Sequence, residues 1–137
     1  ERGRGALRGG RAVSVSRVVA VSEAMVACEL NHSSPSAGLA ALISRARGVR
    51  TYGCASRAIA LVASGSLDAY VDPRGRLGPE SFLAAAFAVE EAGGTVVDLD
   101  GNNFQHLRDP FGTARIVAAA TSELAREITE MLDGDPA

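Results

Sequence analysis

Apolar residues recur along this chain with two different periods, and each change of period marks the boundary of an expected element. Runs in which apolar and polar residues alternate, or in which β-branched residues cluster, indicate strands. These runs occupy residues 12–16, 24–29, 49–53, 67–72, 95–99 and 115–119. Apolar residues at the spacing of one helix face occupy residues 35–47, 56–64, 79–91 and 121–132. Strands separated by helices of this length predict an α/β fold, in which a layered mixed sheet carries helices on its faces.

Capping residues set the expected ends of two of these helices. Ser34 is positioned to cap the first helix, with Pro35 at its first position and Gly48 just beyond its last turn. Gly93 and Gly94 follow the long helix that begins near residue 79, and glycine is suited to close a helix.

Length and composition bound the organisation of the protein. The chain has 137 residues, of which 47% are hydrophobic and 22% are charged, so residues 1–137 are expected to form one globular domain. No apolar run approaches the roughly 20 residues that cross a bilayer, and two cysteines are too few for a disulfide framework. We therefore expect a soluble cytoplasmic protein with no membrane partner.

Charge is distributed unevenly along the chain. Residues 1–50 hold eight Arg against three acids, and residues 51–137 hold six Arg against thirteen acids. The Gly/Arg-rich opening at 1–11 has no interleaved aromatic residues on which bases could stack, so nucleic acid is not expected as a partner. We expect this opening to be flexible.

Several kinds of chemistry have no motif in the sequence. His32 and His106 lie 74 residues apart, with no cysteine or carboxylate at ligand spacing, which disfavours a metal site built on them. The chain also lacks a nucleophile elbow, a P-loop and a dinucleotide-binding fingerprint. Hydride transfer and nucleotide hydrolysis are therefore not expected.

The Gly-Cys-Ala-Ser segment at residues 53–56 joins a predicted strand to a predicted helix. Such a turn presents free backbone N–H groups at the carboxyl end of a strand, where anions bind well. The alternative is structural: Gly53 permits a tight turn, and Cys54 is a small buried residue. Position in the sequence does not separate these two interpretations.

Asp72 ends a predicted strand at the same sheet edge. Its carboxylate is placed to accept hydrogen bonds from sugar hydroxyls. The alternative is a surface ion pair with Arg74 or Arg76, which contributes little to binding or stability.

Five segments, in this order and at this spacing, resemble the inositol monophosphatase family. They are residues 53–56, 65–72, 74–77, 91–94 and 98–101. The stretch 71–77 is most similar to archaeal members that hydrolyse both inositol monophosphate and fructose 1,6-bisphosphate. The opening, residues 3–16, resembles the segment that begins the second half of the family's fold. The resemblance therefore covers nearly the whole chain but only the C-terminal half of the family.

The resemblance implies a Mg²⁺-dependent phosphatase in which metal ions activate a water for attack on a phosphate monoester. It places most metal ligands, a Glu and an Asp-Pro-x-Asp-Gly-Thr motif, in the first half, and neither motif occurs in this chain. The second half supplies one further Asp at the start of the long helix, where this chain has Ser81. The neighbouring Glu80 would point about 100° away on a helix. No catalytic residue and no metal ligand is therefore expected here, and Mg²⁺ is not expected to bind this chain alone.

The resemblance assigns substrate contacts to Gly53, Cys54, Ala55, Asp72 and His32. The first hypothesis is the substrate-side domain of a Mg²⁺-dependent inositol or sugar phosphate phosphatase, inactive alone. The second is a degenerate homologue that serves as a binding or oligomeric assembly module. Expected partners are a small phosphorylated sugar or inositol, and either further copies of the chain or the missing N-terminal half.

Overall fold

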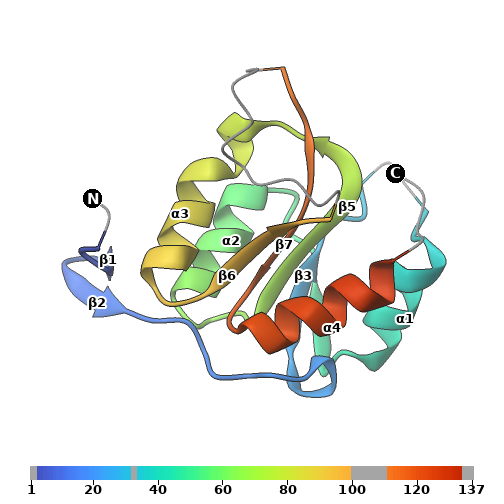
Figure 1. Cartoon of the computed structure of the whole chain (residues 1–137), viewed down its shortest axis with the longest axis horizontal. Helices are drawn as coiled ribbons and strands as arrows, with labels where there is room; N and C mark the ends of the chain where they lie inside the picture. The colour runs from blue at the N-terminus through green and yellow to red at the C-terminus, as the bar shows by residue number, and fades with distance from the viewer. Residues whose placement is uncertain (1–2, 32–33, 100–110, 134–137) are drawn as a thin grey trace.

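The sheet at the centre of the molecule is mixed, and helices cover both of its faces (Figure 1). The computed structural model describes residues 3–31, 34–99 and 111–133. Within these ranges the strands are β3 (Met25–Cys28), β4 (Gly48–Arg50), β5 (Ala69–Leu77), β6 (Thr95–Asp98) and β7 (Ala114–Ala119), in the spatial order β4-β3-β5-β7-β6. Strand β3 is parallel to β4 and β5, and β7 is antiparallel to β5 and β6. The expected α/β fold is confirmed.

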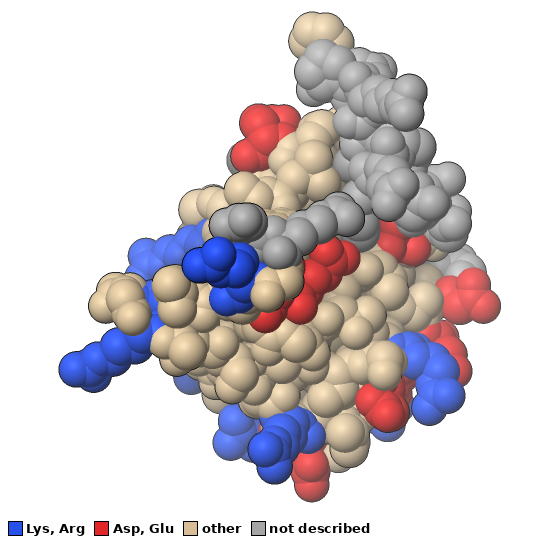
Figure 2. All heavy atoms as spheres, turned by 60° about the vertical axis from the view of Figure 1, so that its left-hand side comes forward, with Lys and Arg blue, Asp and Glu red and all other residues tan. Residues whose placement is uncertain are grey.

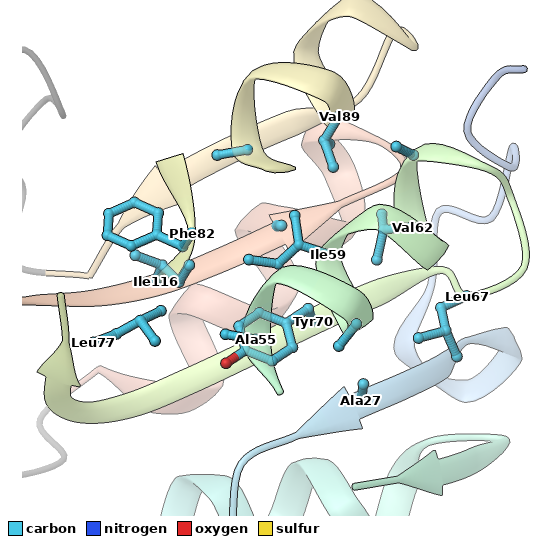
Figure 3. Close-up of a cluster of buried hydrophobic side chains, with 14 of the residues drawn as sticks. Ala27, Ala55, Ile59, Val62, Leu67, Tyr70, Leu77, Phe82, Val89 and Ile116 are labelled. Atoms are coloured by element: carbon cyan, nitrogen blue, oxygen red, sulfur yellow. The ribbon is translucent and has the colours of Figure 1, made fainter. Parts of the chain in front are cut away.

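Two pairs of helices enclose the sheet. Helices α1 (Ala37–Arg45) and α4 (Ser122–Leu132) pack on one face, and α2 (Ala55–Ala63) and α3 (Leu83–Glu91) pack on the other. Figure 3 shows the core between the sheet and helices α2 and α3. In it, Ile59 and Val62 of α2 and Val89 of α3 point toward Tyr70 and Ile116 of the sheet. Burial of these side chains removes apolar surface from water and is the main force that holds the layers together.

The predicted start of the first helix is wrong by two residues. Helix α1 begins at Ala37, and its cap is Ser36, whose Oγ accepts a hydrogen bond of 3.2 Å from the backbone N–H of Leu39. Ser34 and Ser36 have the same capping chemistry, so the sequence does not distinguish them.

The predicted start of the long helix is also wrong. Residues Pro79–Ser81 form a short 3-10 turn, η2, and Phe82 interrupts the helical conformation with a φ of −141°. Helix α3 therefore begins at Leu83. Phe82 is 1% exposed, and its ring lies in the core (Figure 3).

Three predicted strands differ from the structure by more than one residue at an end. Strand β4 ends at Arg50 rather than at residue 53. Strand β2 (Arg11–Val13) is shorter than the predicted 12–16 and pairs only with β1 (Ala6–Arg8), as a small hairpin beside the main sheet. Strand β5, expected to end at Asp72, continues to Leu77 through an irregularity. Between the pairs Asp72↔Ile116 and Leu77↔Ala114, β5 advances five residues while β7 advances two.

A buried ion pair forms within this irregularity. Arg74 donates from Nε and Nη2 to the two carboxylate oxygens of Asp72, at 2.9 and 2.8 Å, and its backbone N–H donates to Oδ1 at 3.1 Å. Gly75 follows with a φ of 66°, which favours glycine. Asp72 is fully buried, so the pair with Arg74 exists but is not the surface pair considered as an alternative.

The first residues that the structure describes are held by one side chain. The carboxylate of Glu91 accepts the backbone N–H groups of Gly3, Arg4 and Gly5 at 2.9, 3.0 and 2.9 Å. The hairpin β1–β2 follows directly.

On the face that Figure 2 shows, Arg side chains lie in several separate groups with uncharged surface between them.

Arg74→Met is expected to destabilise the protein strongly, because it leaves the Asp72 carboxylate buried without its partner. Losing one member of a buried pair costs about 3–5 kcal/mol, measurable as a lower free energy of unfolding in urea. Arg76→Met, at an exposed neighbouring position, is the control and is expected to change stability by less than about 0.5 kcal/mol. An equal decrease in the free energy of unfolding in the two variants would show that the pair between Asp72 and Arg74 does not stabilise the protein.

Glu91→Ala is expected to accelerate hydrogen exchange at the amides of Gly3, Arg4 and Gly5, because their acceptor is removed. Glu90→Ala, at the exposed neighbouring position, is the matched control. The N–H groups also lower the pKa of Glu91, so in the wild type the contact persists below the ordinary carboxyl pKa and is lost as the pH falls through the lowered value. Unchanged exchange in Glu91→Ala would rule out this anchor.

Candidate functional site

A cleft of about 560 Å³ opens at the carboxyl ends of the parallel strands. Its walls come from the segments after β3 and β4, from the irregular part of β5 and from η2. The residues that line it are Glu29, Asn31, Gly53, Cys54, Ala55, Ser56, Arg74, Leu77, Glu80 and Ser81. Because the carboxyl ends of parallel strands meet at one edge, this is where α/β sheets bind ligands.

The predicted turn at residues 53–56 forms one wall of the cleft. Gly53 has a φ of 63°, a conformation that favours glycine, and Cys54 occupies the cap position of α2 without a capping hydrogen bond from its side chain. The first N–H groups of a helix have no partner within the helix. The position of Gly53, Cys54 and Ala55 is thus as expected, and their contact with substrate stays a prediction.

Cys54 is exposed, so the interpretation of this residue as a buried one is wrong. Its Sγ lies 3.6 Å from the Oγ of Ser56. The hydrogen bond from Ser56 lowers the pKa of the Cys54 thiol, and the backbone N–H of Arg57 acts in the same direction. Cys28 differs: it is buried, and burial raises its pKa to about 12.

Asp72 lies behind Arg74 rather than on the wall of the cleft. Both of its carboxylate oxygens accept hydrogen bonds from Arg74, and the Nη1 of Arg74 donates to the carbonyl of Asn31 at 2.9 Å. The guanidinium therefore stands between Asp72 and the cleft. A contact between Asp72 and substrate stays a prediction.

Ser81 and Glu80 both line the cleft. The expectation that Glu80 points away was based on a continuous helix, and it is wrong because η2 replaces the first helical turn. The Oγ of Ser81 donates to Oε1 of Glu80 at 2.9 Å. Ser81 thus stands in the cleft as a neutral hydroxyl.

Glu29 is a cleft residue that the sequence analysis missed. Its side chain follows β3 and is 4% exposed, and its Oε1 has no hydrogen-bond partner among the described residues. Burial raises the pKa of Glu29 and the charge of Asp72 adds to this, whereas Arg74 and the N–H of Gly53 act in the opposite direction. The sequence feature that could have identified Glu29 is its position as a charged residue at the end of the apolar run 24–29.

The described residues do not fit a magnesium site. Mg²⁺ needs several oxygen ligands, carboxylates foremost, and within residues 3–31, 34–99 and 111–133 no group of three or more His, Cys, Asp or Glu is placed to hold a metal. Asp72 is paired with Arg74, and the raised pKa of Glu29 disfavours its ionised form. His32 lies outside the described residues.

No helix in the described part is long and apolar enough to span a bilayer.

Known proteins are similar to this chain over most of its length. The profile of the inositol monophosphatase family matches residues 1–134. Human inositol monophosphatase 2 is 33% identical over 139 residues, which cover 96% of this chain and 46% of the relative. A fructose-1,6-bisphosphatase/inositol-1-monophosphatase from Thermococcus kodakarensis is 33% identical over 95 residues, covering 69% of this chain and 37% of the relative.

Solved structures give the same result. SaIMPase-II, with inositol monophosphate bound, aligns with a TM-score of 0.78 and 25% identity, covering 93% of this chain and 48% of that one. The chain spans about half the length of the relatives it matches. With the family profile matching residues 1–134 and a relative 33% identical over 96% of this chain, the chain belongs to the inositol monophosphatase family.

Proposed function

We propose that this chain is the substrate-side, C-terminal half of a phosphatase that acts on inositol or sugar phosphates. One observation carries the proposal: the turn at residues 53–55, which the family resemblance assigns to substrate, lines the cleft at the sheet edge. The order of the five family segments and the half-length match to the relatives support it. SaIMPase-II, which aligns with this chain, holds inositol monophosphate.

The cleft offers distinct surroundings for the two ends of such a ligand. The N-terminus of α2 supplies backbone N–H groups at Cys54 and Ala55, which suit an anionic phosphate. Polar side chains of Glu29, Asn31 and Glu80 line the remaining wall, and these suit hydroxyls. The chain's own residues bind and orient the ligand in this proposal, whereas the Mg²⁺ that the family resemblance implies would be held by residues outside this chain.

A second candidate, a homologue that binds or assembles without catalysis, is favoured by one observation. Ser81 stands where the family resemblance places a metal-binding Asp, and its hydroxyl is committed to Glu80. A hydroxyl is a weaker ligand for Mg²⁺ than a carboxylate. The exposed Leu7 side chain, 69% accessible, supports assembly with further copies or with the first half of the fold. The two free cysteines support a cytoplasmic location.

The isolated chain is expected to release no phosphate from inositol 1-phosphate or fructose 1,6-bisphosphate in the presence of Mg²⁺, because too few carboxylates converge in its cleft. A fusion to a first half that carries the Glu and the Asp-Pro-x-Asp-Gly-Thr motif is expected to gain turnover. Ser81→Asp should raise the turnover of the fusion about tenfold, as one more charged metal ligand would. Phosphate release measures all three.

The matched control is Ser66→Asp, an exposed serine outside the cleft, which should leave the turnover of the fusion unchanged. Clear hydrolysis by the unfused chain would contradict the proposal. A fusion that stays inactive even with Ser81→Asp would favour the non-catalytic candidate.

Iodoacetamide is expected to alkylate Cys54 in the native protein and to spare Cys28. The thiol of Cys54 is exposed and its pKa is lowered, so more of it is thiolate at a given pH than for an ordinary cysteine. Inositol 1-phosphate should slow the reaction by covering the cleft. Intact-mass spectrometry follows the modification, and 8 M urea, which exposes Cys28, is the control. Equal rates for Cys54 with and without ligand would argue against binding in this cleft.

A further inference from the structure

An unpaired carboxyl oxygen belongs to Glu29, a residue that lines the cleft. Among the described residues, the buried side-chain polar atoms without a hydrogen-bond partner are Oε1 of Glu29 and the hydroxyl oxygen of Tyr70. A buried polar atom left unpaired costs about 1–3 kcal/mol, and native proteins retain few of them. Such an atom in a wall of a binding cleft points to a ligand that completes its hydrogen bonding.

The second unpaired atom belongs to the same corner of the molecule. Tyr70 lies fully buried in β5, and its hydroxyl is directed toward the end of the sheet where Ala55 and Leu77 lie (Figure 3). Both of those residues line the cleft. Burial, and after it the charges of Asp72 and Glu29, raise the pKa of this hydroxyl, so it lies near both acids rather than in the cleft.

Asp72, the acid to which the family resemblance assigns the substrate hydroxyls, is fully buried and does not line the cleft. The Arg74 side chain and backbone occupy both of its oxygens and cover it from the cleft. The Arg74 guanidinium donates to Asp72 from Nε and Nη2 and to the Asn31 carbonyl from Nη1. It makes no hydrogen bond to Glu29 among these contacts. Of the two acids around Arg74, Glu29 is the one with an oxygen left over.

The chemistry of this oxygen selects its ligand. Burial of Glu29 disfavours its ionised form, and metal coordination requires that form. An alcohol O–H suits this carboxyl, since a hydroxyl donates to either form of a carboxyl and accepts from the protonated one. The last torsion of a glutamate side chain is broad, so either oxygen can turn toward the opening.

We propose that Glu29 hydrogen-bonds a hydroxyl of the phosphorylated polyol and thereby selects ligands that carry hydroxyls over phosphate alone. The proposal rests on the function proposed above, because it takes the ligand class from it. It assigns to Glu29 the specificity contact, and it leaves Asp72 to position Arg74.

Amide-resolved NMR titrations of the whole 137-residue chain test this assignment with two probes, inositol 1-phosphate and inorganic phosphate. The wild type is expected to bind inositol 1-phosphate more tightly. Glu29→Met, which keeps the length but removes both oxygens, should weaken inositol 1-phosphate about tenfold and leave inorganic phosphate unchanged. Glu29→Gln, which retains an acceptor and a donor, should stay within about threefold of the wild type.

Glu23→Met, the same substitution at an exposed glutamate outside the cleft, is the matched control and should leave both affinities unchanged. Asp72→Asn, which alters the neighbouring acid, is measured beside it: it is expected to lower stability by weakening the pair with Arg74 and to affect the two probes to a similar extent. Amide signals of β6 and β7, away from the cleft, verify that each variant is folded.

The outcomes separate the two proposals. If the wild type binds neither probe, the proposed function fails and this inference fails with it. If the wild type prefers inositol 1-phosphate but Glu29→Met keeps that preference, the specificity assignment alone is overturned. Loss of the preference in Asp72→Asn but not in Glu29→Met would return the role to Asp72. Shifts at Glu29 on addition of Mg²⁺ alone would identify it as a metal ligand and overturn the assignment.

Discussion

The ion pair between Asp72 and Arg74 is the constraint on which the cleft depends. Burying a carboxylate costs folding free energy unless the group is paired and hydrogen-bonded. Here Arg74, two residues later in the chain, donates hydrogen bonds to both carboxylate oxygens of Asp72. The pair lies within the irregular part of β5, between Asp72 and Leu77. This irregularity then returns Leu77 to pairing with β7, which places η2 and its residues Glu80 and Ser81 on the cleft wall.

The sequence predicted the fold class because hydrophobic period alone decides which segments are strands and which are helices. It failed where two residues have equal local chemistry or where tertiary contacts override a local signal. Ser34 and Ser36 are equivalent caps, and only the structure chooses between them. The Pro-Arg-Gly segment after Asp72 has turn composition, yet it continues β5 because the ion pair and the strand β7 hold it there.

The candidate site was predictable in its backbone and not in its charges. The turn at Gly53 was found because a glycine between a strand and a helix is a local feature. Glu29 was missed because burial of a carboxylate depends on what packs over it, which no local pattern records. The same holds for Asp72, whose availability is decided by the conformation of Arg74. Sequence comparison locates a residue in a site, and geometry decides whether its atoms are free to act there.

The hydrogen bonds from Gly3, Arg4 and Gly5 to Glu91 also fix where this segment lies relative to the cleft. Glu91 ends α3, whereas the cleft lies beyond the other end of that helix, at η2. Nine helical residues separate the two by about 13 Å at 1.5 Å per residue. The segment at residues 3–5 is therefore held at the end of α3 that lies away from the cleft, so a small label attached to residue 3, 4 or 5 would start at about that distance from the ligand.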